Sequence, residues 1–235
     1  AVTGDGADEF FGGYARFRKA YYNQSDDWHH KYFDEMGATT REGRELVFSN
    51  EYKNYIRKIP NKLTKARNHI NEFYENSNSR LKAILKFDQM KRFPSYILRR
   101  VDHLSMASAV EARVPFCQPN IISYATSLPD GFLLDKVAVK KILYRVAAPL
   151  LPESIINRPK HPFTLPIIGM FKKGHVLFNI LQEIINSQSF KGRGFFDTAA
   201  VTKLIDRQIS TPNAGTANML WSIMVLEKWM QSHSC

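Results

Sequence analysis

Apolar residues recur with helical spacing along most of this chain. The pattern predicts helices over residues 62–74, 79–91, 96–110, 120–127, 138–148, 175–185, 199–209 and 217–231. In the last of these, Met219, Ile223, Leu226 and Met230 share one side, which predicts a helix packed into a core. Residues 27–60 are irregular, polar and aromatic, and indicate only short helices and loops.

The first residues have a different pattern. Val2 and Thr3 are typical of a strand end, and Gly4-Asp5-Gly6 is typical of a tight turn. A helix carrying Asp8 should follow and end at Gly12-Gly13. We therefore expect one strand, a turn and a helix at the beginning of an otherwise helical chain.

Length and composition favour a soluble globular protein. The 235 residues are 44% hydrophobic, which is enough for one substantial core, or at most two small ones, and one domain is the default expectation. No run approaches 18 apolar residues, so no membrane span is expected. Only Cys117 and Cys235 are present, too few for a disulfide framework, so a cytoplasmic location is expected. The residues from Ala1 resemble neither a start methionine nor a secretory signal, and we expect a segment of a longer chain.

The net charge of +11 favours an anionic partner. Lysine and arginine are spread along the chain and form no tail or repeated stripe, so general nucleic-acid binding is disfavoured. The phosphates of a nucleotide are the simpler explanation.

The turn after Thr3 is the most informative stretch. Glycines at positions 4 and 6 let backbone amides approach a ligand, and a following helix N-terminus favours negative charge. Asp5, Asp8 and Glu9 would repel a bare phosphate unless a divalent cation lay between them, which points to magnesium pyrophosphate. The alternative is a capped helix whose acidic residues only answer the helix dipole. The spacing lacks the ligands of an EF-hand calcium loop.

Asp88 and Asp102 fall on otherwise apolar helix faces. An unpaired buried carboxylate is costly, so each should have a partner or line a cavity. The structural interpretation pairs them with Arg99, Arg100 or Arg113, whereas the functional interpretation places Asp88 in a site.

Two lysines are candidates for contacts with phosphate. Lys140 precedes an amphipathic helix, and Lys160 lies between Pro159 and Pro162, which brace it in a loop. Most lysines are solvated surface residues, so this pattern alone does not show whether Lys140 and Lys160 contact phosphate or only solvent.

Other chemistry has little support. The histidines and cysteines show no metal-ligand spacing, and His29-His30 is interpreted as a solvated pair. No arrangement of Ser, His and Asp indicates nucleophilic hydrolysis.

Taken in order, these segments resemble the glutamine-hydrolysing asparagine synthetase family. The similarity extends over nearly the whole chain and is least distinctive at residues 27–78. The matching segments are residues 3–9 (TGDGADE) through 12–14 (GGY), 101–107 (VDHLSMA), 111–116 (EARVPF), Lys140 with Ile142-Leu143, Leu151-Pro152, 158–160 (RPK) with Phe163 and Pro166, and Leu220-Trp221 with 226–229 (LEKW).

The resemblance implies a fold and a reaction. The fold would be the α/β ATP-pyrophosphatase type, truncated so that residues 1–235, the C-terminal half of the synthetase domain, are mostly α-helical with a residual N-terminal strand. In the family, ATP activates the side-chain carboxylate of aspartate as an acyl adenylate, and ammonia from glutamine displaces AMP. A first phosphate loop and an N-terminal glutaminase domain would precede Ala1, so we expect no synthetase activity from this chain alone. A homodimer is compatible with the resemblance.

The resemblance also implies roles for individual residues, with ATP and Mg²⁺ as the cofactors. Asp8 would ligate the magnesium, and Gly4 and Gly6 would let the turn approach pyrophosphate. Asp5 would face the substrate pocket, and Asp88 would lie near the site of amine attack. Lys160 would stabilise charge on the α-phosphate, and Lys140 would hold the departing pyrophosphate.

Some positions depart from the family pattern. Cys117-Gln118 replaces an apolar residue and Asp, Tyr144 stands where Arg is common, and His161-Pro162 replaces a Gly-containing pair. These departures weaken the assignment of aspartate as the substrate. A related amidotransferase or cyclase of a biosynthetic cluster, and a non-catalytic anion-binding fragment, therefore stay as alternatives.

Overall fold

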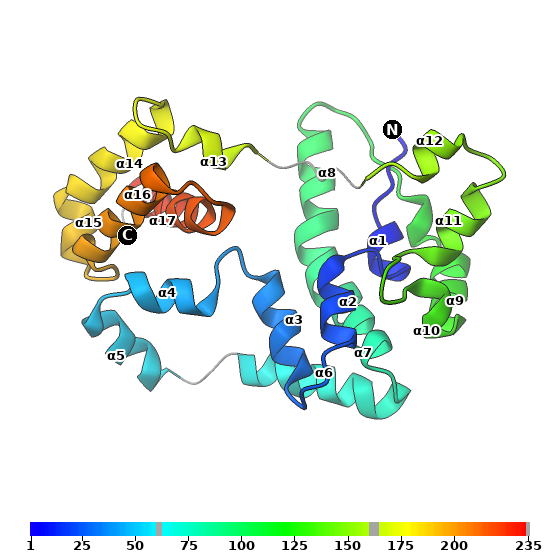
Figure 1. Ribbon diagram of the computed structural model, residues 1–235. Coiled ribbons are helices and arrows are strands. Elements are labelled where there is room, and N and C mark those ends of the chain that lie inside the picture. Colours follow the sequence, from blue (N-terminus) through cyan, green and yellow to red (C-terminus); the bar gives the residue numbers. More distant parts are fainter. Residues whose placement is uncertain (60–62, 160–164, 234–235) are drawn as a thin grey trace. The chain divides into compact units, whose positions relative to one another are not determined.

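The computed structural model describes residues 1–59, 63–159 and 165–233 of the chain. Helices dominate these residues, as expected, and β-structure within them is limited to isolated bridges (Figure 1). Two compact units form, which is the alternative that the length allowed beside the default of one domain: residues 1–33 with 62–160, and residues 34–61 with 161–235. Each unit combines segments that are far apart in the sequence.

Unit 1 contains the predicted turn and most of the predicted site residues. Its helices are α1 (Ala7–Phe10), α2 (Ala15–Tyr21), the first part of α3 (Trp28–Met36), α6 (Leu63–Ser77), α7 (Arg80–Phe87), the π-helix η1 (Asp88–Leu98), α8 (Arg99–Met106), the 3-10 helix η2 (Pro115–Cys117), α9 (Pro119–Ser127), α10 (Asp130–Leu133), α11 (Lys141–Ala147) and α12 (Glu153–Ile156). Fully buried side chains of α2, α3 and α7 form its core, among them Phe17, Tyr32, Leu81 and Ile84.

The predicted N-terminal strand is reduced to one bridge. Val2 pairs in parallel with Arg113. The Thr3 amide donates to the Arg113 carbonyl at 2.9 Å, and the Arg113 amide donates to the Ala1 carbonyl at 2.8 Å. This pairing fixes the chain entering the Gly4–Gly6 turn.

The helices predicted at 79–91 and 96–110 form one continuous helical run, α7–η1–α8. Pro94 lies inside η1 and does not separate two helices. The Arg99 amide donates to the Pro94 carbonyl, five residues back, as in a π-helix. Because proline has no N–H and clashes with an α-helical turn, the wider π turn accommodates it where the sequence pattern predicted a break.

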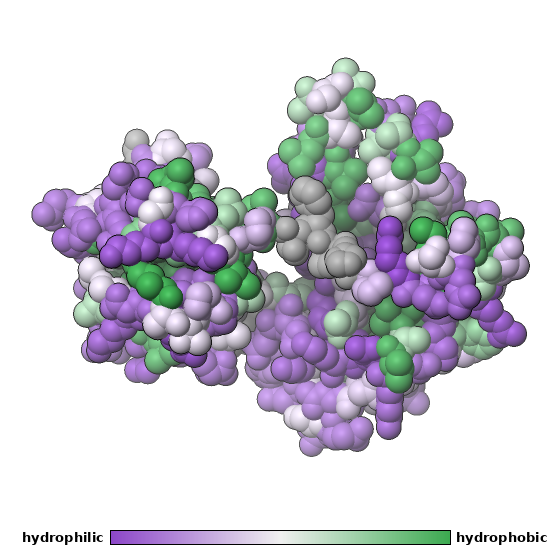
Figure 2. Space-filling view, turned by 45° about the horizontal axis from the view of Figure 1, so that its top comes forward, coloured by the Kyte–Doolittle hydropathy of each residue, from purple (hydrophilic) through white to green (hydrophobic). Residues whose placement is uncertain are grey.

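Helix α8 differs from its predicted environment. None of its residues is buried, Asp102 is exposed, and Leu104 and Met106 are 68% and 52% exposed. The expectation that Asp102 needs a partner or lines a cavity is therefore wrong, because its helix face is open to water. Helix α8 thus exposes apolar side chains, and Figure 2 shows hydrophobic patches within the largely hydrophilic surface of each unit.

Unit 2 is a helical bundle around a separate core. It contains the end of α3, α4 (Arg41–Val47), α5 (Asn50–Lys58), α13 (Ile167–Met170), α14 (Val176–Asn186), α15 (Gln188–Arg193), α16 (Thr198–Ser210) and α17 (Ala214–Ser232). Helix α17 contacts α13, α14 and α16, which confirms the core-packed C-terminal helix. Leu226 is an exception, at 42% exposed, whereas Glu227 is buried and bound to Arg193 Nε at 2.9 Å.

Among the described residues, none of the helices combines the length and apolar character needed to cross a lipid bilayer. This agrees with the absence of long apolar runs in the sequence.

Candidate functional site

The turn from Gly4 to Asp8 is held from inside by Glu9. Gly6 has a φ of 95°, a left-handed conformation that glycine adopts without strain. Its amide donates to Glu9 Oε2 at 3.1 Å, and the Tyr14 hydroxyl donates to Glu9 Oε1 at 2.5 Å. Glu9 is only 2% exposed, so its carboxylate braces the turn and does not face solvent.

The sequence pattern does not predict this role of Glu9: it groups Glu9 with Asp5 and Asp8 around a divalent cation, with an answer to the helix dipole as the alternative. Helix α1 has only four residues, so its dipole is small. The signal was present: a glutamate three residues after the residue that precedes a helix is a capping-box pattern. Burial raises the pKa of Glu9, and the hydrogen bond from Tyr14 opposes that rise. Burial also raises the pKa of the Tyr14 hydroxyl, and its hydrogen bond to Glu9 raises that pKa further.

Asp8 and Lys140 meet although they are far apart in the sequence. Lys140 Nζ lies 2.8 Å from Asp8 Oδ1, and the two side chains are 20% and 22% exposed. Lys140 has a φ of 51° and directly precedes α11, which therefore begins at Lys141 and not at residue 138. The predicted metal ligand and the predicted pyrophosphate-binding lysine thus form one ion pair within reach of solvent.

Gly13 allows Asp8 to take this position. The Gly13 amide donates to the Asp8 carbonyl at 2.8 Å, and a Cβ on Gly13 would lie 1.9 Å from Asp8 Oδ1. The sequence pattern identified Gly13 only as a helix stop. Its contact with the Asp8 carboxylate could not be read from local spacing.

The two glycines of the turn are under different constraints. A Cβ on Gly4 would meet nothing within 4 Å, whereas a Cβ on Gly6 would lie 3.1 Å from the Cys117 Sγ and 3.2 Å from Phe116. Asp5, between them, is half-buried. The described fold therefore requires glycine at position 6 but leaves room for a side chain at position 4.

Cys117 packs behind the turn as a neutral thiol. Burial raises the pKa of Cys117, and the nearby carboxylates of Glu9 and Asp5 raise it further. The thiol consequently stays protonated at neutral pH and backs the turn as a small apolar group.

Asp88 is fully buried and both of its oxygens are bound. Arg16 lies 3.1 and 3.2 Å from Oδ1 and Oδ2, and the Tyr32 hydroxyl donates to Oδ1 at 2.7 Å. The predicted partners Arg99, Arg100 and Arg113 are wrong, because the partner arginine comes from α2, 72 residues away. Local helix spacing does not contain this contact.

A chain of contacts links Asp88 to the turn. The Arg16 guanidinium lies 3.7 Å from the centre of the Tyr14 ring, and Tyr14 binds Glu9. In addition, Gln89 Nε2 donates to the Glu9 carbonyl at 3.1 Å. Asp88 therefore supports the turn through Arg16 and Tyr14. Lys160, the other predicted catalytic residue, lies outside the described residues.

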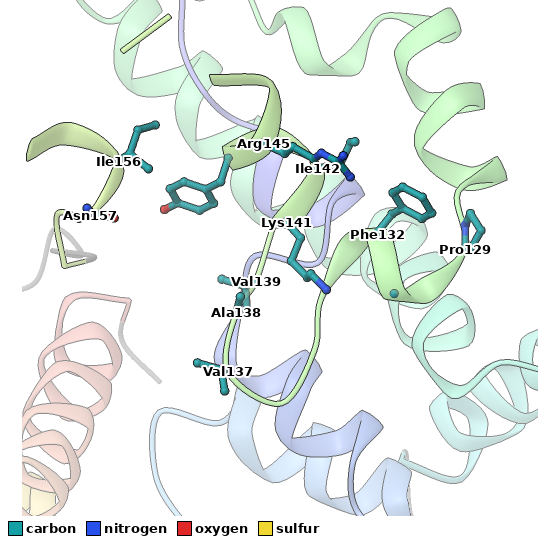
Figure 3. A pocket seen from close by; sticks show the side chains of 12 residues that line it. Pro129, Phe132, Val137, Ala138, Val139, Lys141, Ile142, Arg145, Ile156 and Asn157 are labelled. Carbon is teal, nitrogen blue, oxygen red and sulfur yellow. The ribbon is translucent and has the colours of Figure 1, made fainter. Parts of the chain in front are cut away.

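A cavity of about 870 Å³ adjoins the segment that carries Lys140 (Figure 3). Phe132, Val137 and Ile142 give it a mainly apolar lining, with Lys141 and Arg145 as its charged groups. Of the described site residues, neither Asp8 nor Lys140 lines it. The cavity is thus separate from the ion pair at the turn.

Comparison with known proteins places these features in a family. The family model described as asparagine synthase matches residues 1–231. A putative glutamine-hydrolysing asparagine synthetase of Mycobacterium tuberculosis is 29% identical over 57% of this chain and 20% of its own length. Glutamine-hydrolysing asparagine synthetase 1 of Bacillus subtilis is 23% identical over 97% of this chain and 40% of its own length.

A fungal protein is also similar. Amidase chry2 of Gibberella zeae is 24% identical over 87% of this chain and 37% of its own length. The chain therefore spans between a fifth and two fifths of these relatives. No solved structure matches it significantly. Because the family model covers nearly every residue, the chain belongs to the asparagine synthase family.

Proposed function

We propose that the complete protein is an ATP-dependent amide ligase that converts aspartate to asparagine. It would adenylate the side-chain carboxylate of aspartate and aminate it with ammonia from glutamine, releasing AMP and pyrophosphate. Family membership and the names of the bacterial relatives support this reaction class. The observation that carries the proposal is the ion pair between Asp8 and Lys140 at a glycine-bounded turn.

The reaction separates into two displacements. A carboxylate oxygen of aspartate attacks the α-phosphorus, and the bond to pyrophosphate breaks. Ammonia then attacks the acyl carbon, AMP leaves with one former carboxylate oxygen, and the nitrogen loses a proton. Negative charge builds on the pyrophosphate in the first step, so a fixed cation there lowers the barrier. Lys140 would supply it by exchanging the Asp8 carboxylate for a phosphate oxygen, and its ion pair with Asp8 supports this role.

The residues at the turn fit a magnesium nucleotide. Asp8 has a carboxylate 22% exposed to solvent, and Asp5 beside it is half-buried, so oxygen ligands are within reach of a hydrated cation. Mg²⁺ bound there would neutralise charge on the phosphates. Gly4 and Gly6 would keep side chains away from the phosphates, and Asp5 would face the substrate pocket.

The remaining assignments complete the proposal. Lys160 would act on the α-phosphate. Asp88 was expected near the site of amine attack, but its contacts with Arg16 and Tyr32 favour a positioning role. A glutaminase domain of the parent chain would supply ammonia, in a cytoplasmic protein.

Isotope transfer tests the proposal directly. The complete protein, given Mg-ATP, glutamine and aspartate labelled with ¹⁸O in its side-chain carboxylate, should release AMP carrying one label together with asparagine. Asp8→Asn should lose this activity, whereas Asp206→Asn, an exposed aspartate of α16, should keep it. Unlabelled AMP, or asparagine formed without AMP, would exclude the acyl-adenylate route.

A second candidate is a related amidotransferase or cyclase with another carboxylate substrate. Two observations favour it: the similarity to Amidase chry2 over most of the chain, and the departures at Cys117 and Tyr144. AMP release with a panel of carboxylates distinguishes the candidates. Turnover of another carboxylate with none of aspartate would replace the first proposal by the second.

A further inference from the structure

Three side chains of types that commonly bind metal ions converge at the beginning of α3, outside the turn described above. Asp27 directly precedes α3, and His29 and His30 lie in its first turn. His29 Nε2 lies 3.5 Å from Asp27 Oδ1, and His30 Nε2 lies 3.6 Å from Asp27 Oδ2. The three ligand atoms all lie within 4.8 Å of one another. The sequence pattern predicts a solvated histidine pair, but His29 is buried, so this convergence is a product of the fold.

The separations suit a small transition-metal ion. Zinc bound tetrahedrally at about 2.0–2.2 Å from each ligand sets neighbouring ligand atoms about 3.3–3.6 Å apart. The two observed nitrogen–oxygen distances, 3.5 Å from His29 to Asp27 Oδ1 and 3.6 Å from His30 to Asp27 Oδ2, lie within or at the edge of that range, and a small turn of the carboxylate would bring one oxygen toward both imidazoles. Two imidazoles with one carboxylate form a donor set that zinc and similar ions use, whereas Mg²⁺ and Ca²⁺ prefer oxygen ligands alone.

The histidines are held in a partly dry environment with unsatisfied nitrogens. The His29 side chain is 10% exposed, and its ring packs edge-on against Trp28 at 5.6 Å. Among the described residues, His30 Nε2 is buried without a hydrogen-bond partner, and so is His29 Nδ1. Burying unpaired polar atoms is costly, and a ligand that engages His30 Nε2 would relieve part of that cost.

Arg67 of α6 occupies the place of a cation in this cluster. Its Nε donates to His29 Nε2 at 3.1 Å, and its guanidinium lies 3.5 Å from Asp27 Oδ1. A positive group thus already contacts two of the three ligand atoms. The His29 imidazole therefore has Nε2 unprotonated, which is the form that binds a metal.

We propose that Asp27, His29 and His30 form a binding site for a divalent transition-metal ion of the zinc type, which Arg67 keeps closed by acting as an internal cation. A metal ion would bind both imidazoles and the Asp27 carboxylate, and a water molecule would complete a four-coordinate site. Arg67 would swing away toward solvent, since its side chain is already 30% exposed. The site is independent of the proposed ligase reaction.

Metal titration of the full chain tests the site without an activity assay. After removal of metals by chelation, Zn²⁺ binding is measured by calorimetry, and Co²⁺ is used as a spectroscopic substitute for its visible ligand-field bands. We expect one tight site in the wild type. Asp27→Asn and His30→Ala should each weaken it by more than the roughly 10- to 100-fold that loss of an outer hydrogen-bond partner costs. These two positions are more exposed than His29, so folding should survive, as checked by the unfolding midpoint without metal.

Two further variants test the specificity of the site and the role of Arg67. His175→Ala, at an exposed histidine before α14, should bind as the wild type does. Arg67→Met keeps an apolar stem but removes the competing charge, and it should bind Zn²⁺ more tightly than the wild type. Binding that persists when Asp27 and His30 are both replaced, or no binding by the wild type, would overturn the site. An unchanged affinity in Arg67→Met would overturn the internal-cation role.

Discussion

Two aspartates of unit 1, Asp8 and Asp88, both belong to the predicted site, yet the fold treats them in opposite ways. Asp8 keeps a carboxylate 22% exposed and has Lys140 as an ion-pair partner. Asp88 is fully buried, and Arg16 and Tyr32 bind both of its oxygens. Under the proposed reaction Lys140 would exchange Asp8 for a phosphate oxygen, whereas Arg16 and Tyr32 hold Asp88 in the protein's interior.

The contrast shows that a carboxylate with a partly exposed partner and a carboxylate bound in the interior respond differently to the loss of that partner. A buried pair loses its hydration on both sides, so removing one partner leaves an uncompensated charge. A partly exposed pair loses little when it opens, because water and salt replace it. The two regions are nevertheless connected, since Arg16 stacks on Tyr14, which binds Glu9 beneath the turn.

Replacing Asp88 should give the largest effect on stability. Asp88→Asn keeps the shape but leaves Arg16 without its counter-charge, and we expect a loss of about 3–5 kcal/mol in the free energy of unfolding. Denaturant unfolding measures it. Asp102→Asn, at an exposed position on the same helical run, should change stability by less than about 0.5 kcal/mol. Equal small effects of both variants would remove the distinction between the two aspartates.

Replacing Lys140 should instead affect the reaction. Lys140→Ala in the complete protein should lower kcat by about 100- to 1000-fold, the usual cost of losing one fixed group that stabilises developing charge. Its unfolding free energy should change by no more than about 1 kcal/mol. The neighbouring Lys141→Ala serves as control, because Lys141 pairs with Asp135 at 2.9 Å and does not contact Asp8 in the described contacts. A fully active Lys140→Ala would contradict the proposed role.

A methyl group on Gly13 should disturb Asp8 and leave the contacts of Asp88 unchanged. The added Cβ would overlap Asp8 Oδ1, so Gly13→Ala should cost about 1–3 kcal/mol and displace the carboxylate from Lys140. Gly192→Ala, where nothing lies within 4 Å of the added Cβ, should be neutral or stabilising by up to about 1 kcal/mol. Thermal unfolding of both variants checks this, and a neutral Gly13→Ala would show that the turn adapts freely.

The smallest expected effect is the pH dependence due to Glu9. Burial raises the pKa of Glu9 above its ordinary value of 4.5, so the folded state binds more protons than the unfolded state above that pH. Stability from this group is therefore complete below pH 4.5 and decreases as pH rises through the raised pKa. Glu9→Gln should lack this decrease, which amounts to at most about 1.4 kcal/mol per pH unit. Parallel pH profiles of the two proteins would refute the assignment.

The sequence predicted the helices and turns of this chain much better than it predicted the contacts between them. Helices α6, α9, α14, α16 and α17 begin and end within a few residues of their predicted bounds, because their apolar spacing is local. The turn at Gly4–Gly6 was also predicted, since glycine pairs are local signals. The predicted helix break near Pro94 was wrong, because a π turn depends on the register of the whole helical run.

The site divides in the same way. Sequence motifs identified Asp8 and Lys140, but only the fold showed that the two are in contact. The sequence did not predict that Glu9 would bind the Gly6 amide, or that Gly13 would leave room for the Asp8 carboxylate. Both features depend on atoms that local spacing does not bring together. The convergence of Arg67 on Asp27 and His29 is a further case.

By itself, the sequence determined the helical character, the glycine turn and membership in the asparagine synthase family, since all three are written in neighbouring residues or in ordered motifs. Only the tertiary structure decided that the chain forms two units and that Asp88 binds Arg16, 72 residues away. The physical reason is that periodicity shows which face of a helix avoids water. Which charge is buried against which partner depends on how distant segments pack.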